Sequence, residues 1–150
     1  MDLQLSGKRA IVTGGSRGIG FAVAQALAAE GVAVTLVARD RAALDRAAAE
    51  LGGGAVGVVA DTTDDHAVRS MVAVAGRVDI LVNAAARPAG SIPDAPASAT
   101  TDDSLREQLE TKVLGYLRCA RAVAPQMVDR VSVNGDAVAV GGGQPGVVHY

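Results

Sequence analysis

Thr13-Gly14-Gly15-Ser16-Arg17-Gly18-Ile19-Gly20 is a glycine-rich stretch between an apolar run and a segment with helical periodicity. Residues 9–13 form the apolar run and predict a short buried strand, after which apolar residues recur at helical spacing: Ile19, Val23, Ala26 and Leu27. The glycines therefore lie where a strand becomes a helix. Because the first N–H groups of a helix are unpaired and carry partial positive charge, this position can bind phosphates.

Three of these glycines have distinct expected roles in a dinucleotide site. Gly14 allows a tight turn, Gly18 lets the backbone approach a pyrophosphate, and Gly20 lets the helix and the strand pack closely. The alternative is an ordinary tight loop between a strand and a helix. A glycine-rich turn alone does not decide between the two interpretations, so the surrounding chain has to do so.

Strand-like and helix-like segments alternate along the first half of the chain. Apolar runs predict further strands at residues 33–38, 55–59 and 79–83, and helical stripes lie between them and end at glycines. This alternation predicts an α/β fold, a Rossmann-like doubly wound parallel sheet with right-handed crossovers. We expect one domain over residues 1–150, incomplete at its carboxyl end because the pattern stops after about five strands.

The composition narrows the class of protein. The chain of 150 residues has a net charge of −2, which does not suggest binding to nucleic acid or to a membrane surface. No signal peptide and no membrane-length apolar stretch is visible, so the expected location is cytoplasmic. Cys119 is the only cysteine and is expected to be a small core residue. His66 and His149 lie too far apart to suggest a metal site.

The second half of the chain begins with a long proline-containing loop over residues 84–103. Ser104 and Glu107 have the spacing of a capping box and predict the start of a long fourth helix that reaches Met127, with Pro125 expected to kink or end it. Residues 131–133 and 137–140 then predict two short strands around a turn.

Two motifs give the chain its resemblance to a known family. The spacing Gly-x-x-x-Gly-x-Gly after a threonine, together with Asn83-Ala84-Ala85-Ala86, resembles the short-chain dehydrogenase/reductase family over about residues 6–127. Ala86 stands where the family signature has glycine. The resemblance implies hydride transfer between a nicotinamide ring and a carbonyl or alcohol carbon. It implies cofactor contacts at Gly14, Ser16, Arg17, Gly18, Ile19, Gly20, Arg39, Asp61, Thr62, Asn83, Ala84 and Ala85.

The residues after the second strand favour NADP(H) over NAD(H). A guanidinium complements a 2′-phosphate, whereas an acidic side chain at this place accepts hydrogen bonds from a 2′-hydroxyl. Arg39 directly follows the strand and Arg17 adds a second cation near the same corner. Asp40 keeps NAD(H) open as the alternative, and both arginines could instead be solvated surface charges.

The loop after the third strand contains a second expected cofactor contact. Asp61 resembles the family aspartate that accepts a hydrogen bond from the adenine amino group. A carboxylate before a helix is also an ordinary helix cap, and the cluster at residues 61–64 allows both roles.

The catalytic set that the resemblance implies is incomplete. Tyr150 lies at about the family distance for the acid/base tyrosine, but the sequence has no lysine four positions later. Lys112 aligns with the family asparagine of the fourth helix, where it either alters the proton relay or is simply an exposed residue, and Ser132 is the only serine candidate. A phenol with its ordinary pKa of about 10 is a poor base at neutral pH.

Two hypotheses follow from the sequence. The first is the cofactor-binding portion of an NADP(H)-dependent oxidoreductase that acts on a small carbonyl or alcohol substrate, as a fragment or degenerate form. The second is a non-catalytic nucleotide-binding or interaction module. The first also predicts an exposed apolar face on the fourth helix, and hence either self-association as a homo-oligomer or instability.

Overall fold

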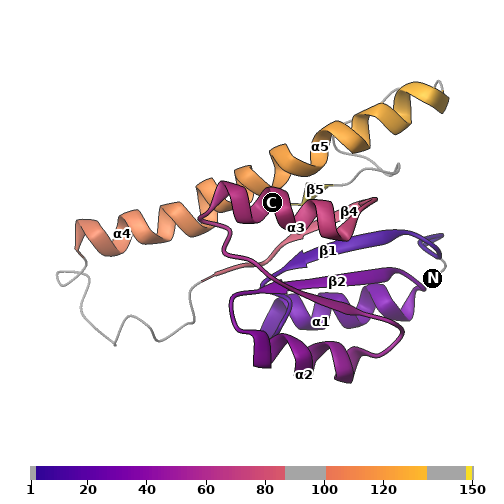
Figure 1. Cartoon of the computed structure of the whole chain (residues 1–150), viewed down its shortest axis with the longest axis horizontal. Helices are drawn as coiled ribbons and strands as arrows, with labels where there is room; N and C mark the ends of the chain where they lie inside the picture. The colour runs from indigo at the N-terminus through magenta and orange to yellow at the C-terminus, as the bar shows by residue number, and fades with distance from the viewer. Residues whose placement is uncertain (1–2, 87–100, 135–147, 150) are drawn as a thin grey trace.

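The computed structural model describes residues 3–86, 101–134 and 148–149 of the chain. It contains a five-stranded sheet in the order β3-β2-β1-β4-β5, in which every neighbouring pair is parallel. The strands are β1 (Arg9–Thr13), β2 (Ala33–Ala38), β3 (Val56–Val59), β4 (Ile80–Asn83) and β5 (Val148–His149). The doubly wound α/β fold predicted from the sequence is therefore confirmed (Figure 1).

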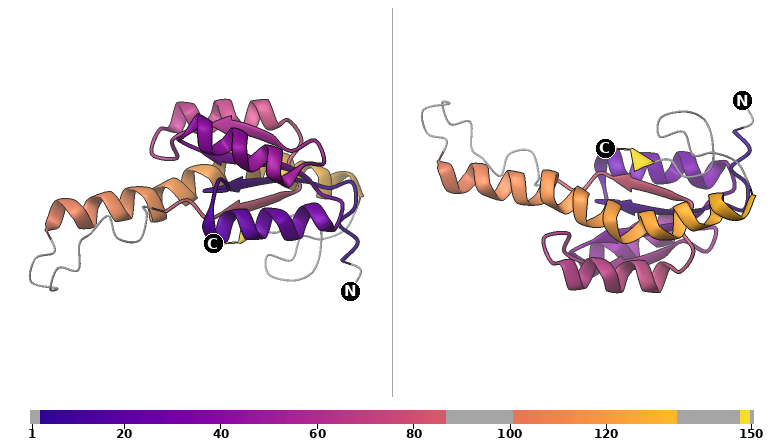
Figure 2. Two further views of the ribbon diagram at one scale, coloured as in Figure 1. Left: turned by 90° about the horizontal axis from the view of Figure 1, so that it is seen from below. Right: turned by 90° about the horizontal axis from the view of Figure 1, so that it is seen from above.

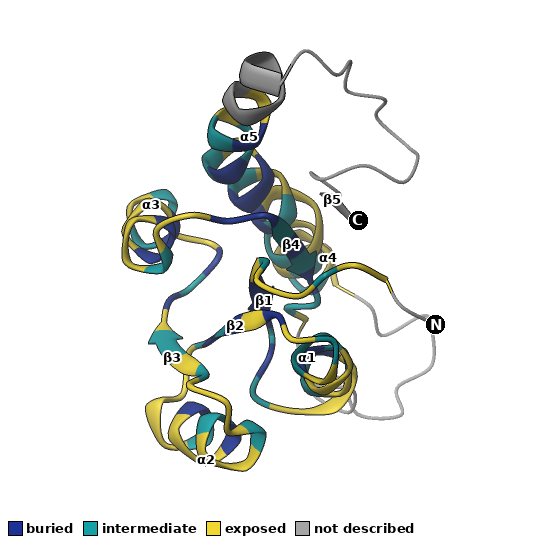
Figure 3. Ribbon diagram, turned by 90° about the vertical axis from the view of Figure 1, so that its right-hand side faces the viewer, coloured by how far each residue is buried: buried dark blue, intermediate teal, exposed yellow. Residues whose placement is uncertain are grey.

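Helices cover both faces of the sheet. The crossovers are α1 (Gly18–Ala29), α2 (Arg41–Leu51) and α3 (Asp65–Ala75), and the long second-half helix comprises α4 (Asp102–Leu109), a π-helical turn η2 (Glu110–Leu114) and α5 (Gly115–Asn134). Figures 2 and 3 show α1 and α2 on one face and α3 and α5 on the other. Among the described residues, no helix is long and apolar enough to cross a membrane.

The strands divide their side chains between two cores. Ile11 and Val37 point to the α3/α5 face, where they pack with residues such as Met71 and Val123. The alternate residues of the same strands, such as Val12 and Leu36, point to the α1/α2 face. This alternation is what a parallel sheet buried on both sides requires.

The predicted apolar stripe of the first helix is only partly correct. Leu27 packs against the core and Val23 is half-buried, whereas Ile19 is 82% exposed and Ala26 is also exposed. The fully buried residues of α1 are Gly20 and Ala24. Small residues at a four-residue interval let α1 approach the sheet closely. Ile19 lies in the first turn of the helix and is not part of the face that packs on the sheet.

Cys119 lies in the α3/α5 core, as expected for a small apolar residue. Burial raises the pKa of its thiol to about 11, against a smaller lowering by the charge of Arg118. At pH 8 only about one thiol in a thousand is then the reactive thiolate. We expect iodoacetamide to modify the folded protein far more slowly than the urea-unfolded protein, as followed by intact mass. Complete modification of the folded chain within minutes would contradict this burial.

The start of the fourth helix corrects one prediction. Thr101, not Ser104, is the N-cap, and its side chain accepts a hydrogen bond of 3.2 Å from the Ser104 N–H. The Ser104 hydroxyl donates back to the Thr101 carbonyl at 2.8 Å. The capping-box prediction placed the start about one turn too late, because both hydroxyl residues precede the same apolar pattern.

The end of this helix differs from the predictions. Of the two effects predicted for Pro125, a kink or an end, the end is wrong, because the helix continues past the proline to Asn134. Residues 131–133, predicted as a strand, belong to α5. Conversely, β5 forms at Val148–His149 beside β4, where no strand was predicted. The predicted strand at residues 137–140 lies outside the described residues.

An exposed apolar face on the fourth helix was also predicted, and several large side chains of this helix are indeed exposed. They are Leu105, Leu109, Val113, Leu114, Leu117 and Val128. Figure 1 shows α4 projecting beyond the end of the sheet. Self-association through this face stays a prediction.

Candidate functional site

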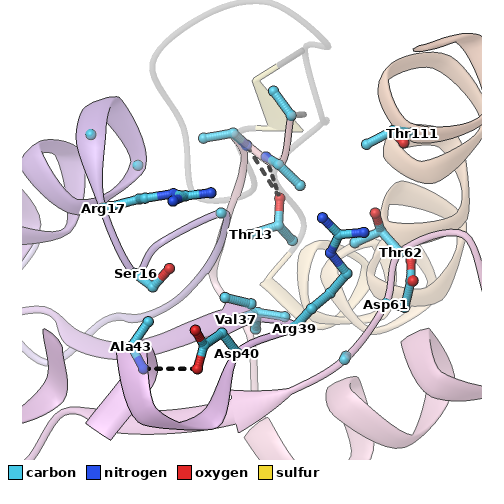
Figure 4. A pocket seen from close by; sticks show the side chains of 18 of the residues that line it. Thr13, Ser16, Arg17, Val37, Arg39, Asp40, Ala43, Asp61, Thr62 and Thr111 are labelled. Carbon is cyan, nitrogen blue, oxygen red and sulfur yellow. Dashed lines mark hydrogen bonds between the residues drawn. The ribbon is translucent and has the colours of Figure 1, made fainter. Parts of the chain in front are cut away.

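A cavity of about 890 Å³ lies at the carboxyl ends of the strands. Its wall comes from the loop after β1, the end of β2, the loop after β3, the residues that follow β4, and residues of α4 and η2 (Figure 4). The sheet order reverses between β1 and β4, and in open parallel sheets such a switch point is where ligands bind. Most of the predicted cofactor contacts line this cavity: Gly14, Ser16, Arg17, Gly18, Ile19, Gly20, Arg39, Asp61, Thr62, Ala84 and Ala85.

Thr13 joins the two strands at the switch point. Its hydroxyl donates to the Val82 carbonyl at 3.3 Å and accepts hydrogen bonds from the Ala84 and Ala85 N–H groups at 3.2 and 3.3 Å. Thr13 is fully buried. This residue therefore fixes the start of the glycine-rich loop against the end of β4. The sequence analysis used Thr13 only as part of the motif and missed this role.

The glycine-rich loop packs directly on the backbone after β4. Gly14 has a φ of +68°, and a Cβ there would lie 2.5 Å from the Ala84 carbonyl oxygen. A Cβ on Gly20 would lie 2.4 Å from the Gly14 carbonyl oxygen, so Gly20 closes on the loop itself rather than on a strand. A Cβ at Gly18 would meet no atom within 4 Å. The loop is thus tightly packed at Gly14 and Gly20, whereas the space beside Gly18 is open.

The start of α1 lies at this opening, and no side chain of its first turn occupies the N–H groups or would repel an anion. Arg17 is the N-cap residue, and its side chain makes no capping hydrogen bond. The first turn of α1 contains no acidic residue. Since the first N–H groups of a helix have no partner within the helix, this end is suited to bind phosphate.

Arg17 and Arg39 extend into the cavity from different sides (Figure 4). Arg17 comes from the start of α1, and Arg39 reaches from the end of β2 toward Asp61 and Thr62. Asp40 also lines the cavity, but its carboxylate caps α2 by accepting a hydrogen bond of 3.1 Å from the Ala43 N–H. An aspartate just before a helical stripe is a signal for this capping role.

Two aspartates of the loop after β3, Asp61 and Asp64, were considered for two roles, the cap of the next helix and a cofactor contact. Asp64 caps α3 by accepting hydrogen bonds from the His66 and Ala67 N–H groups, so Asp61 is not the cap. One oxygen of Asp61 accepts from the Thr63 N–H at 2.9 Å and from its hydroxyl at 2.8 Å. Asp61 lines the cavity.

The Asp61 carboxyl is held in its charged form. Burial raises its pKa, but the two hydrogen bonds from Thr63 and the positive charges of Arg39 and Arg118 outweigh this effect and bring the pKa below its ordinary value. Asp61 is therefore an anionic hydrogen-bond acceptor at the cavity at neutral pH.

Asn83 lies behind the cavity, not in its wall. Its Nδ2 donates a long hydrogen bond of 3.5 Å to the Tyr116 carbonyl, which links β4 to α5. Its Oδ1 is buried and has no hydrogen-bond partner among the described residues. The three alanines that follow line the cavity, and Ala86 is exposed there.

Lys112 lies in η2 and is both exposed and part of the cavity wall. Gln108 and Thr111 accompany it in the cavity wall, and neither was predicted as a site residue. Gln108 could have been found from its position four residues before Lys112, on the same face of the helix, and Thr111 from its place directly before Lys112. π-Helical turns often occur at functional sites because they shift the register of one helix face.

The structure does not place the two other candidate catalytic residues, Tyr150 and Ser132, in the cavity wall. Tyr150 lies outside the described residues. Ser132 belongs to α5 rather than to the end of a strand, which removes the structural basis for its predicted role. Within the described ranges, no group of three or more His, Cys, Asp or Glu side chains could hold a metal ion.

Known proteins with this arrangement were found by sequence and by structure. The family model described as short chain dehydrogenase matches residues 8–147. Galactitol 2-dehydrogenase (L-tagatose-forming) of Cereibacter sphaeroides is 40% identical over 131 residues, which are 85% of this chain and 50% of the relative. Galactitol 2-dehydrogenase of Agrobacterium fabrum is 35% identical over 132 residues, again 85% of this chain and 50% of the relative.

Solved structures of reductases are similar to this chain in fold and in sequence. L-sorbose reductase from Gluconobacter frateurii, complexed with NADPH and L-sorbose, matches with a TM-score of 0.77 and 33% identity over 87% of this chain and 51% of that one. The 3-ketoacyl-(acyl-carrier-protein) reductase from Brucella melitensis, complexed with NADH, matches with a TM-score of 0.76 and 30% identity over 87% and 54%. The chain spans about half the length of the curated relatives that it matches. Its motifs, its sheet order and these matches show that the chain belongs to the short chain dehydrogenase family.

Proposed function

We propose that the cavity binds NADP(H) and that the protein is an NADP(H)-dependent oxidoreductase for a small carbonyl or alcohol substrate. The observation that carries this proposal is the glycine-rich loop. It leaves no room for a Cβ where it packs on Ala84, yet it presents the start of α1 to an open cavity flanked by two arginines. A dinucleotide needs this combination of close backbone approach and positive charge.

Each part of the dinucleotide has a candidate partner in the cavity wall. The backbone from Gly14 to Gly20, including Ser16 and Ile19, would bind the pyrophosphate. Asp61 and Thr62 would bind the adenine, because a charged carboxylate accepts the hydrogen bond of an amino group. Ala84 and Ala85 would lie along the cofactor, and Asn83 would support them from behind.

The choice of NADP(H) over NAD(H) depends on the corner after β2. Arg39 and Arg17 supply guanidinium groups for a 2′-phosphate. The carboxylate that would favour NAD(H) belongs to Asp40, which is already engaged as the cap of α2. An engaged carboxylate has less acceptor capacity for a ribose hydroxyl.

A nicotinamide cofactor, when bound, would supply or accept the hydride. The described residues of this chain would bind and orient it, and Lys112 places an ammonium group at the cavity wall, at the position that the resemblance aligns with the family asparagine. Tyr150 stays a prediction for the proton transfer, based on its sequence spacing. Relatives named for galactitol and L-sorbose support a small polar substrate.

Titration of the protein with NADPH and NADH tests the proposal. We expect the fluorescence of NADPH to change on binding with a dissociation constant in the micromolar range, and NADH to bind more weakly. Displacement by 2′,5′-ADP should exceed displacement by 5′-ADP, because only the former carries the 2′-phosphate. No binding of either dinucleotide at millimolar concentration would reject the proposal and favour a non-catalytic interaction module.

A further inference from the structure

Arg118 of α5 joins the far helix to the loop after β3. Its Nη1 donates to the Thr62 carbonyl oxygen at 3.3 Å, and its Nη2 lies 2.5 Å from a carboxylate oxygen of Glu110. The Arg118 side chain is only 17% exposed although it is charged. Removing a guanidinium from water is costly unless its donors are satisfied, so a specific pairing is needed here.

A second contact brings the same helix against the same loop residue. A Cβ at Gly115 would lie 3.0 Å from the Thr62 hydroxyl oxygen and 3.3 Å from its carbonyl oxygen. Gly115 and Arg118 lie three residues apart on one face of α5. The helix therefore packs closely on Thr62 at Gly115 and binds its carbonyl oxygen through Arg118.

This contact matters because of the neighbour of Thr62. Asp61 faces the cavity, and its pKa is lowered in part by the charge of Arg118. The loop segment from Ala60 to Thr63 is neither strand nor helix. Its described ties to the rest of the fold include the Ala60 N–H bond to the Ala38 carbonyl on one side and the Arg118 bond on the other. Loss of the Arg118 bond would remove one of these two ties of the segment, while the hydrogen bonds from Thr63 to the Asp61 carboxylate would stay within the loop.

We propose that Arg118, held by Glu110, is a positioning residue that fixes the Asp61–Thr62 segment for recognition of the adenine amino group. This inference depends on the proposed function, because it assigns Arg118 a role in the same cofactor site. Arg118 itself does not line the cavity, so it acts through Thr62 and Asp61.

Two dinucleotides that differ at the adenine amino group distinguish a specific effect of Arg118 on recognition of that group from a general loosening of the cofactor site. NADPH carries the adenine amino group, and reduced nicotinamide hypoxanthine dinucleotide phosphate carries an oxygen in its place. We expect Arg118→Met to weaken NADPH binding about tenfold, the size of one charge-assisted hydrogen bond. The hypoxanthine analogue should bind the variant and the wild type almost equally. Glu110→Gln should have a smaller effect in the same direction.

Arg121→Met is the matched control. Arg121 lies on the same helix, is 64% exposed, and pairs with Asp65 at 4.0 Å, away from the cavity. This variant should leave both affinities unchanged, and thermal unfolding of each variant shows whether it is folded.

Three outcomes would overturn the inference. Equal weakening of both dinucleotides would show a merely structural role for Arg118. If both Arg118→Met and Glu110→Gln kept the wild-type ratio of the affinities for NADPH and the hypoxanthine analogue, the positioning role would be rejected. The proposed function would still stand in that case, provided that the wild type binds NADPH. Absence of NADPH binding to the wild type would reject the proposed function itself.

Discussion

Gly14→Ala is expected to lower the free energy of unfolding by about 3 kcal/mol and to abolish measurable NADPH binding. Two effects add. A left-handed backbone at φ +68° costs an alanine about 1–2 kcal/mol. The new Cβ would also lie 2.5 Å from the Ala84 carbonyl oxygen and 2.8 Å from the Ala85 nitrogen, both of them backbone atoms that must shift.

Gly54→Ala separates the two effects. Gly54 has a φ of +77°, but a Cβ there meets no atom within 4 Å. This variant carries the backbone strain alone and should cost about 1 kcal/mol without changing NADPH affinity. Urea unfolding followed by circular dichroism gives both values. Equal destabilisation by the two substitutions would show that the close packing of the loop on Ala84 is absent in solution.

Arg39→Asp is expected to reverse the cofactor preference, with the ratio of the NADPH to the NADH dissociation constant rising about a hundredfold. Loss of a charge-assisted hydrogen bond to the 2′-phosphate accounts for about 1.5–3 kcal/mol. The new carboxylate adds repulsion of the phosphate and can accept hydrogen bonds from the 2′-hydroxyl of NADH. Fluorescence titration with each dinucleotide at one ionic strength measures the ratio.

Arg41→Asp is the control for net charge. Arg41 lies two positions later, is 67% exposed, and pairs with Asp45 on the surface of α2. The same change of charge there should alter the ratio little, because exposed charges are screened by salt. An unchanged ratio for Arg39→Asp, or an equal change for Arg41→Asp, would reject a direct contact between Arg39 and the 2′-phosphate.

Elements with a strong local pattern were predicted well. The strand at residues 33–38 was predicted with the bounds that β2 has, because a continuous apolar run is bounded by Gly31 and Arg39. The start of α2 has an equally local signal in its cap Asp40, although the sequence analysis considered Asp40 only as a possible cofactor contact. The parallel order of the sheet followed from the alternation of strands and helices, which permits few other topologies.

Short or edge patterns were predicted poorly. Residues 131–133 are apolar enough for a strand but continue α5, because a short apolar run does not distinguish a strand from a turn of buried helix. Ile19 fits a helical stripe, yet it is exposed at the cavity. The difference depends on what faces α1, which is information from distant parts of the chain.

The sequence by itself determined the βα alternation, the glycine-rich loop and the cations around it, because strand, helix and turn preferences depend on residues close together in the chain. Only the tertiary structure decided that Thr13 binds the backbone after β4 and that Arg118 binds Thr62. Thr13 and Ala84 are 71 positions apart, and Arg118 and Thr62 are 56. Local propensity carries no information about such pairs, because the packing of helices on the sheet brings them together.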